Sequence, residues 1–150
     1  MERDDALRRG VAEALGAGAL VFFGAGAPIV LSALGNPSLL EVALANGLAI
    51  AIMVTALGHI SGGHFNPAVT FGFWVTGRIT SRMAGIYVLF QLAGAVLFAL
   101  LLRGIFDDRF YDRFDGGAPT LSPGISSAEG LLFEIIGTFF LVFVVFATAV

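Results

Sequence analysis

The sequence has no cysteine, no lysine and few charged residues of either sign. Only 13% of its 150 residues are charged, the net charge is −3, and the eight basic residues are all arginine and form no basic run. Without cysteine, the chain has no disulfide framework, no thiolate metal site and no cysteine nucleophile. Without a basic run, it has no surface suited to tracking nucleic-acid phosphates, so we expect no nucleic-acid partner.

Apolar side chains dominate what remains. Hydrophobic residues make up 57% of the chain, and a mean hydropathy of +0.92 excludes an ordinary soluble domain. The apolar runs are long and do not alternate, which favours helices over a barrel. Four of them are long enough to cross a bilayer, and we expect spans at about 11–34, 39–60, 83–105 and 129–150. The predicted fold class is therefore an all-α membrane protein.

The arginines indicate how these spans are oriented. Five of them precede the first span or lie at positions 78 and 82, whereas the other three, at 103, 109 and 113, are diluted by four aspartates. The positive-inside rule then places the N-terminus in the cytoplasm, as an uncleaved tail. Residues 106–128 become an external loop, irregular because of its prolines and paired glycines. We expect an integral protein of a bacterial-type plasma (inner) membrane.

A polar, glycine-rich stretch lies between the second and third spans. Asn66 is a preferred helix N-cap, and Pro67 suits the first helical position, so a helix is predicted to begin there. It ends before Gly77, which makes it roughly 15 Å long and too short for a ~30 Å hydrocarbon core. Residues 61–77 are therefore predicted to form a re-entrant loop and half-helix. Such backbone is tolerated at membrane depth only where protein buries it or water adjoins it, which indicates a pore or a binding site.

The first and fourth spans resemble each other at a constant separation of 134 − 13 = 121 residues. Residues 13–22 match residues 134–143 at five of ten positions, and the match includes an intramembrane glutamate in each, Glu13 and Glu134. Three spans separate the two segments, so the repeat is of inverted topology. The same separation places a second asparagine at 66 + 121 = 187. We therefore expect a single, truncated domain over residues 1–150, in which the inverted repeat is incomplete.

These features together resemble the aquaporin, or major intrinsic protein, family. The segment Ser61–Thr70 is similar to the family's first Asn-Pro-Ala box and its lead-in, Glu13 and Glu134 lie where each half-repeat begins, and Tyr87 with Gln91 is similar to its Tyr-x-x-x-Gln pattern. The resemblance implies an aquaporin-like right-handed bundle of six spans, in which two half-helices meet at mid-membrane, assembled as a homotetramer. It implies a passive channel for water or small uncharged solutes that excludes protons and ions.

The resemblance also implies roles for individual residues. Backbone carbonyls would line the pore as acceptors, the Asn66 amide would donate to the passing solute, and polar side chains in the spans would support the loops. The expected pore-lining residues are Gly62, Gly63, His64, Asn66, Pro67, Ala68 and Asn46, and the expected supporting residues are Glu13, Glu134 and Gln91. The two glutamates are interpreted as acceptors for buried N–H groups and not as proton carriers.

Asn46 leaves the choice of solute open. It stands where the resemblance implies phenylalanine in water channels and tryptophan in glycerol channels, and a short amide would widen or polarise the constriction. A glycerol, metalloid or ammonia facilitator is therefore an alternative, and a non-conducting truncated oligomerisation module is another. No enzyme is expected, because no nucleophile, base and orienting group occur together. No cofactor is expected, and His59 with His64 lacks further ligands for a metal.

Overall fold

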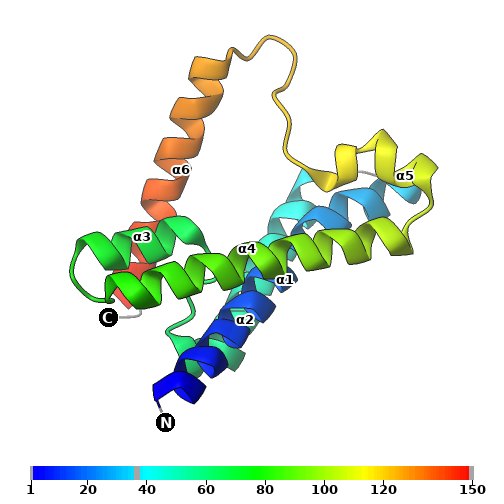
Figure 1. Cartoon of the computed structure of the whole chain (residues 1–150). Coiled ribbons are helices and arrows are strands. Elements are labelled where there is room, and N and C mark those ends of the chain that lie inside the picture. Colours follow the sequence, from blue (N-terminus) through cyan, green and yellow to red (C-terminus); the bar gives the residue numbers. More distant parts are fainter. Residues whose placement is uncertain (1, 36–37, 149–150) are drawn as a thin grey trace.

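The computed structural model describes residues 2–35 and 38–148 and contains only helices, turns and connecting segments in these ranges (Figure 1). The elements, in chain order, are α1 (Glu2–Ala33), α2 (Leu39–Ser61), α3 (Pro67–Val75), α4 (Ser81–Ile105), α5 (Asp108–Arg113), the 3₁₀ turn η1 (Asp115–Gly117) and α6 (Ser127–Thr148). Within the described residues α1, α2, α4 and α6 are long and apolar enough to cross a membrane. The prediction of an all-helical chain with four candidate spans is confirmed.

The helix ends differ from the expected spans at both termini of the chain. α1 begins at Glu2 and not near residue 11, because the charged tail continues the helix, with Arg9 lying 3.8 Å from Asp5 one turn away. α6 begins at Ser127, where Glu129 accepts from the backbone N–H and the hydroxyl of Ser126. Ala149 and Val150, expected in the fourth span, lie outside the described residues.

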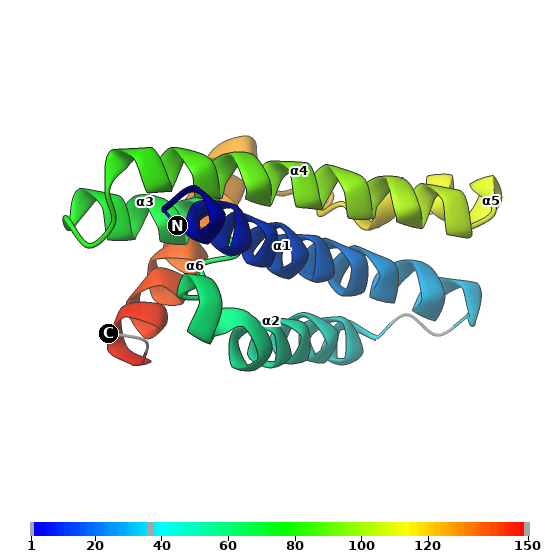
Figure 2. The same ribbon diagram turned by 60° about the horizontal axis from the view of Figure 1, so that its bottom comes forward.

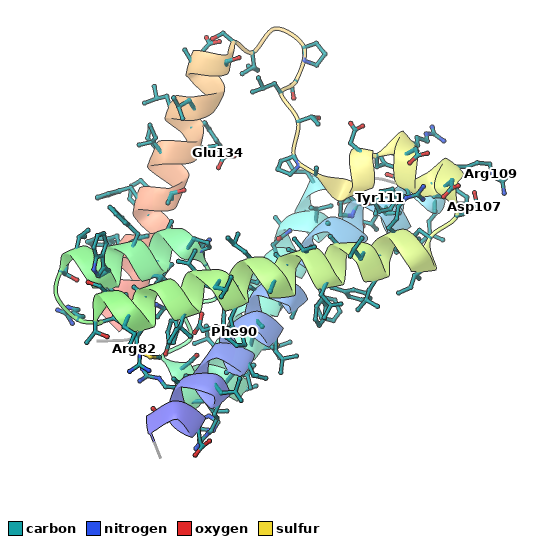
Figure 3. All side chains as sticks on the ribbon, in the orientation of Figure 1. Arg82, Phe90, Asp107, Arg109, Tyr111 and Glu134 are labelled. Atoms are coloured by element: carbon teal, nitrogen blue, oxygen red, sulfur yellow. The ribbon has the colours of Figure 1, made fainter. Side chains whose placement is uncertain are left out.

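α1 packs against α4 on one side and α2 on the other (Figure 2). The α1–α4 approach is close, since a Cβ built on Gly94 would lie only 2.1 Å from the carbonyl oxygen of Ala14. A Cβ on Gly10 would likewise lie 2.8 Å from the ring of Phe90, which Figure 3 labels on α4. Only glycine allows the helices to meet at this distance, and the interior of the protein lies along this seam.

α6 stands apart from this pair. It packs against α3, through Val142 and Phe146, which approach Gly72, and Figure 1 shows it rising away from α1 and α4. None of its described residues is fully buried. Its apolar side chains would therefore be covered by lipid or by other protein segments.

The sequence predicted an irregular loop over residues 106–128. This prediction is wrong in part, because the connection contains α5 and η1. Asp107 caps α5 by accepting from the N–H of Arg109 at 3.0 Å. The guanidinium of Arg109 donates to the same carboxylate, which holds the pKa of Asp107 below its usual value. Arg103 also pairs with Asp108. Asp107 and Asp108, which offset the positive charge of the arginines in this loop, thus also stabilise the first turn of α5.

Candidate functional site

The turn from α2 into α3 depends on two glycines. Gly62 is the C-cap of α2, with φ +96°, and its N–H donates to the carbonyl of Gly58 at 2.8 Å. Gly63 follows with φ +69°. This left-handed backbone is open to glycine at little cost but disfavours other residues. The two glycines therefore allow the chain to leave α2 and turn back toward α1 within two residues.

Phe65 has the same backbone conformation without being a glycine. Its φ is +47°, and its side chain is 2% exposed. The ring lies against α1, where a Cβ on Gly16 would come within 2.0 Å of it. A strained residue of this kind persists only where its surroundings fix it. The bare backbone at Gly16 and the hydrogen bond made by the Phe65 N–H provide that support.

That hydrogen bond goes to Glu13, which is fully buried on α1. Both carboxylate oxygens accept two hydrogen bonds each. Oε1 accepts from the Ser61 hydroxyl at 2.6 Å and the His64 N–H at 3.1 Å, and Oε2 accepts from the Phe65 N–H at 2.6 Å and the Gln91 amide at 2.7 Å. Donors from three segments of the chain therefore converge on one acceptor, and hydrogen bonds of this type to a carboxylate are the strong ones.

These contacts also orient the amide of Gln91. The Gln91 atom facing Glu13 is Nε2, which donates to Oε2, and its other N–H donates to the hydroxyl of Thr70 at 2.9 Å. The hydrogen of that hydroxyl is then available to donate to Nδ1 of His64, 3.1 Å away. Nδ1 of His64 and the Thr70 hydroxyl are therefore hydrogen-bonded, and the direction of this bond follows the tautomer of the ring. The remaining Gln91 oxygen is buried without a partner among the described residues.

The same contacts orient the backbone carbonyls of the loop. In a planar trans peptide the N–H and the preceding C=O point in opposite directions. The N–H groups of His64 and Phe65 point at Glu13, and that of Gly63 points at the Ser61 hydroxyl, 3.2 Å away. The carbonyls of Gly62, Gly63 and His64 therefore face away from Glu13, as a row of three acceptors.

Asn66 caps α3 in the way the sequence indicates. Its Oδ1 accepts from the N–H of Ala68 at 2.8 Å, its backbone is extended, and Pro67 occupies the first helical turn. Because the oxygen makes the cap, the NH₂ group keeps two donors for other partners. Asn66 and Pro67 line a cavity of about 540 Å³, here named the Asn46–Asn66 cavity. Its other lining groups include Asn46, Phe65, Gln91, Tyr111 and residues 115–119.

Asn46 reaches this cavity from α2. Its Nδ2 donates to the carbonyl of Val42 one turn earlier, at 2.9 Å. Its Oδ1 lies over α1, where a Cβ on Gly24 would come within 2.4 Å of it. The amide is therefore held against α1, with its polar atoms at the edge of the cavity.

Not every expected residue joins this site. Glu134 is exposed on α6, where Figure 3 labels it. The predicted role of Glu134 concerned the loop of a second half, near position 187, which is not part of this sequence. Ala68 donates to Asn66 and also lines an apolar groove between α3 and α6. His59 is exposed at the end of α2, and within the described ranges no group of three potential ligands could hold a metal ion.

The structure also brings in residues to which the sequence reasoning gave no role. Thr70 links Gln91 to His64, and Arg9 donates to the hydroxyl of Tyr87 at 2.9 Å. For Arg9 and Tyr87 the sequence contained a signal, because Arg9 lies four residues before Glu13 and Tyr87 lies four residues before Gln91. Residues four apart lie on one face of a helix. Arg9 is therefore expected on the same face of α1 as Glu13, and Tyr87 on the same face of α4 as Gln91.

Four helices are of bilayer length, and three of them, α1, α2 and α4, contribute side chains that contact a polar loop held by a buried carboxylate. Such an arrangement keeps polar groups in the interior and presents apolar side chains outside, which defines an integral membrane protein with an internal polar site.

Comparison with known proteins gives the family. The family model described as Major intrinsic protein matches residues 1–150. The chain is 43% identical to aquaporin NIP1-1 of Zea mays over 140 residues, which cover 93% of this chain and 48% of that protein. It is 45% identical to aquaporin PIP2-5 of Oryza sativa subsp. japonica over 116 residues, 77% of this chain and 41% of that protein. The chain belongs to the major intrinsic protein family.

This assignment confirms the resemblance seen in the sequence, and with it the expectation of a family of membrane channels and not of enzymes. A third relative, aquaporin TIP4-4 of Zea mays, is 46% identical over 114 residues, 75% of this chain and 43% of that protein. The chain spans about half the length of the curated relatives it matches.

Proposed function

We propose that this chain forms one half of a passive channel for water and small uncharged solutes, which excludes protons and ions. The observation that carries the proposal is the hydrogen bonding of the Asn66 side-chain amide. Its oxygen is engaged in capping α3, and its NH₂ group, with two donors, borders a cavity of about 540 Å³. A donor fixed in this way can bind a passing water oxygen without having to reorient.

The acceptors of the loop complete this arrangement. The carbonyls of Gly62, Gly63 and His64 face away from Glu13, so they can accept from water on the side opposite the carboxylate. A molecule passing them would exchange hydrogen bonds with bulk water for hydrogen bonds with a fixed row of acceptors. This exchange keeps the barrier to an uncharged solute low, as it does in other selective pores.

α3 supports the exclusion of cations. In the proposed channel it is a re-entrant half-helix, whose nine residues begin at Pro67. The N-terminus of a helix carries roughly half a positive charge, and Asn66 holds it at the edge of the cavity. A cation or an excess proton approaching this point would be repelled, whereas a neutral solute would not.

The proposed assembly follows the sequence expectation. The channel is an aquaporin-like right-handed bundle, the second half-helix and two further spans come from outside this sequence, and the full-length form is a homotetramer. Three relatives named aquaporins, each about twice as long as the matched segment, support this proposal. The arginine distribution supports a cytoplasmic N-terminus. The relatives come from plants and do not support a bacterial-type inner membrane, so the proposal does not extend to it.

Asn46 favours a second candidate, a facilitator for glycerol, metalloid acids or ammonia. The family resemblance implies an aromatic ring at this position, whereas Asn46 places a shorter amide on the cavity wall. The Asn46 amide also packs closely on Gly24. The cavity is then both wider and more polar than one bounded by a ring. A non-conducting oligomerisation module is the remaining alternative, and it predicts no flux of any solute.

The test uses the full-length protein that contains this chain, purified and reconstituted in proteoliposomes. Water flux is measured by light scattering after an osmotic step, and proton flux by an enclosed pH-sensitive dye. We expect water permeability well above that of protein-free vesicles, with proton flux at the lipid background. Uptake of glycerol or urea distinguishes the second candidate. Water and proton fluxes that rise together would contradict the proposal, and the absence of any flux would favour the oligomerisation module.

A further inference from the structure

Two side-chain pairs, one helix turn apart, join α1 to α4. Glu13 and Gln91 form the pair described above. One turn toward the N-terminus of each helix, Nε of Arg9 donates to the hydroxyl oxygen of Tyr87 at 2.9 Å. The Arg9 guanidinium carbon also lies 5.6 Å from the centroid of the Tyr87 ring. The two pairs are therefore side-chain hydrogen bonds on successive turns of the same two helices.

The close approach of the helices holds the second pair together. Gly10 follows Arg9, and its missing side chain leaves room for the ring of Phe90, which would lie 2.8 Å from a Cβ at this position. Phe90 is labelled on α4 in Figure 3. Tyr87 has no exposed surface, and its ring also meets that of His64 edge-on, with centroids 5.1 Å apart. Tyr87 thus has a fixed position between α1 and the loop.

Arg9 determines the direction of the tyrosine hydroxyl. An arginine can only donate, so the Tyr87 oxygen must accept from it and its own hydrogen must point elsewhere. That hydrogen is donated to the carbonyl oxygen of Ser61. The order of donation is therefore fixed, from Arg9 through Tyr87 to the backbone of Ser61.

The Ser61 carbonyl is the point at which α2 passes into the loop. It belongs to the last residue of α2 and so has no partner within the helix, and Ser61 is 2% exposed. The peptide plane that contains this carbonyl is followed by the planes of the Gly62, Gly63 and His64 carbonyls. Glu13 and the Ser61 hydroxyl hold the later planes through their N–H groups. The first plane is held through its N–H by the Gly58 carbonyl and through its oxygen by Tyr87.

We propose that Arg9 and Tyr87 are positioning residues for the pore, which set the direction of the loop carbonyls from the end of α2. Arg9 acts through Tyr87, and Tyr87 acts through the Ser61 carbonyl. The effect on permeation rests on the proposed function of the chain, whereas the effect on the order of the loop does not. The alternative is that Arg9 only contributes charge to the end of α1, where it lies 3.8 Å from Asp5.

The experiment compares four variants of the full-length protein in lipid nanodiscs, Tyr87→Phe, Arg9→Met, the double variant, and Arg8→Met. Arg8 is the matched control, because it neighbours Arg9 and is exposed, and its substitution removes the same charge. Amide hydrogen exchange of the segment 61–66 is measured by mass spectrometry, with α6 as an internal reference. Water permeability of each folded variant is measured in parallel.

We expect Tyr87→Phe to speed exchange of the 61–66 segment by about tenfold or more, since a buried carbonyl loses its donor. Arg9→Met should speed it in the same direction, and the double variant should be no faster than Tyr87→Phe alone, because Arg9 acts through Tyr87. Arg8→Met should leave the loop unchanged. In each variant with faster exchange, water permeability should fall while the helical content stays the same.

Three results would overturn the proposal. They are unchanged loop exchange in Tyr87→Phe, equal effects of Arg8→Met and Arg9→Met, or additive effects in the double variant. If Tyr87→Phe fails to fold, Arg9→Met against Arg8→Met still decides the matter, because both remove one charge from the same turn of α1 and, of the two, it is Arg9 that donates to Tyr87. If the wild-type protein conducts no water, the proposed function fails, yet the exchange measurements still test the positioning pair.

Discussion

The backbone N–H of Phe65 donates to Oε2 of Glu13 at 2.6 Å, across 52 residues of sequence. This contact ties the most strained residue of the loop to the one buried carboxylate of α1 among the described residues. Because the same carboxylate also holds Ser61, His64 and Gln91, the geometry of the loop follows from the position of a single side chain.

Replacing Glu13 with glutamine should destabilise the protein. The amide keeps the shape of the carboxylate but presents an NH₂ group to two donors that need acceptors, and such a mismatch costs on the order of 1–3 kcal/mol for each group left unpaired. Thermal unfolding followed by circular dichroism measures the loss. Glu41→Gln on the exposed first turn of α2 is the control and should change little. Equal stability of the two variants would contradict a supporting role for Glu13.

Two glycines of α4 should respond in opposite ways to alanine. In Gly94→Ala the new Cβ would lie 2.1 Å from the carbonyl oxygen of Ala14, which the backbone of α1 can relieve only by moving away. We expect a loss of at least ~1–3 kcal/mol, as for other overpacked sites. Gly85→Ala meets nothing within 4 Å and should be neutral or stabilising by ~0.5–1 kcal/mol. Unfolding midpoints of the pair provide the test, and similar midpoints would show that the α1–α4 seam is not tight.

Asn66 caps α3, and the proposed function gives it a second, separable role as a donor to the permeating molecule. Asn66→Asp keeps an acceptor at the N-cap and a charge that suits a helix N-terminus, so stability should be preserved. It removes the NH₂ donors, and the loss of one hydrogen bond of ~1–1.5 kcal/mol corresponds to about tenfold in rate. Water permeability per folded channel should therefore fall while the unfolding midpoint stays near that of the wild type.

Asn66→Ala should instead lower both the water permeability and the unfolding midpoint. It removes the cap, worth typically about 1 kcal/mol, as well as the donors. If the aspartate variant conducts water as well as the wild type does, the amide does not contact the permeating molecule.

Asn46→Phe should change selectivity more than total flux. The ring would fill part of the cavity that Asn46 shares with Asn66 and would crowd the bare backbone at Gly24. We expect uptake of glycerol or urea in proteoliposomes to fall more than water flux. Ile52→Phe, on an exposed face of the same helix, is the control for added bulk. Equal reductions of water and solute flux by Asn46→Phe would show that this position does not set the size limit.

The sequence predicted the parts of this fold that depend on local chemistry. Long apolar runs located the four spans, and the order asparagine, then proline, located the start of α3, because both signals depend only on neighbouring residues. α5 was missed because its six residues form a helix through a cap at Asp107 and a pair between Arg103 and Asp108. These contacts compete with the prolines and glycines that follow, and composition alone does not show which prevails.

The site required information that local patterns do not contain. The sequence marked Glu13 as unusual because a carboxylate is rare in a span, but it did not show which four groups donate to it. The left-handed backbone of Phe65 was also unpredictable, because phenylalanine disfavours it. The packing of its ring against Gly16, 49 residues away in sequence, and the hydrogen bond from its N–H to Glu13 support this conformation.

The order of synthesis adds a constraint on how Glu13 is accommodated. The ribosome makes α1 first, and the hydroxyl and amide groups of the loop that satisfy Glu13 are 48 to 52 residues further along the chain. During that interval the Glu13 carboxylate lies in a membrane helix without its partners, and an unpartnered acidic side chain makes insertion less favourable. The fourth donor, Gln91, is 78 residues away on α4. α1 therefore gains its full stability in the bilayer only after α4 has emerged, so the biogenesis of the first span depends on a part of the chain not yet translated when it inserts.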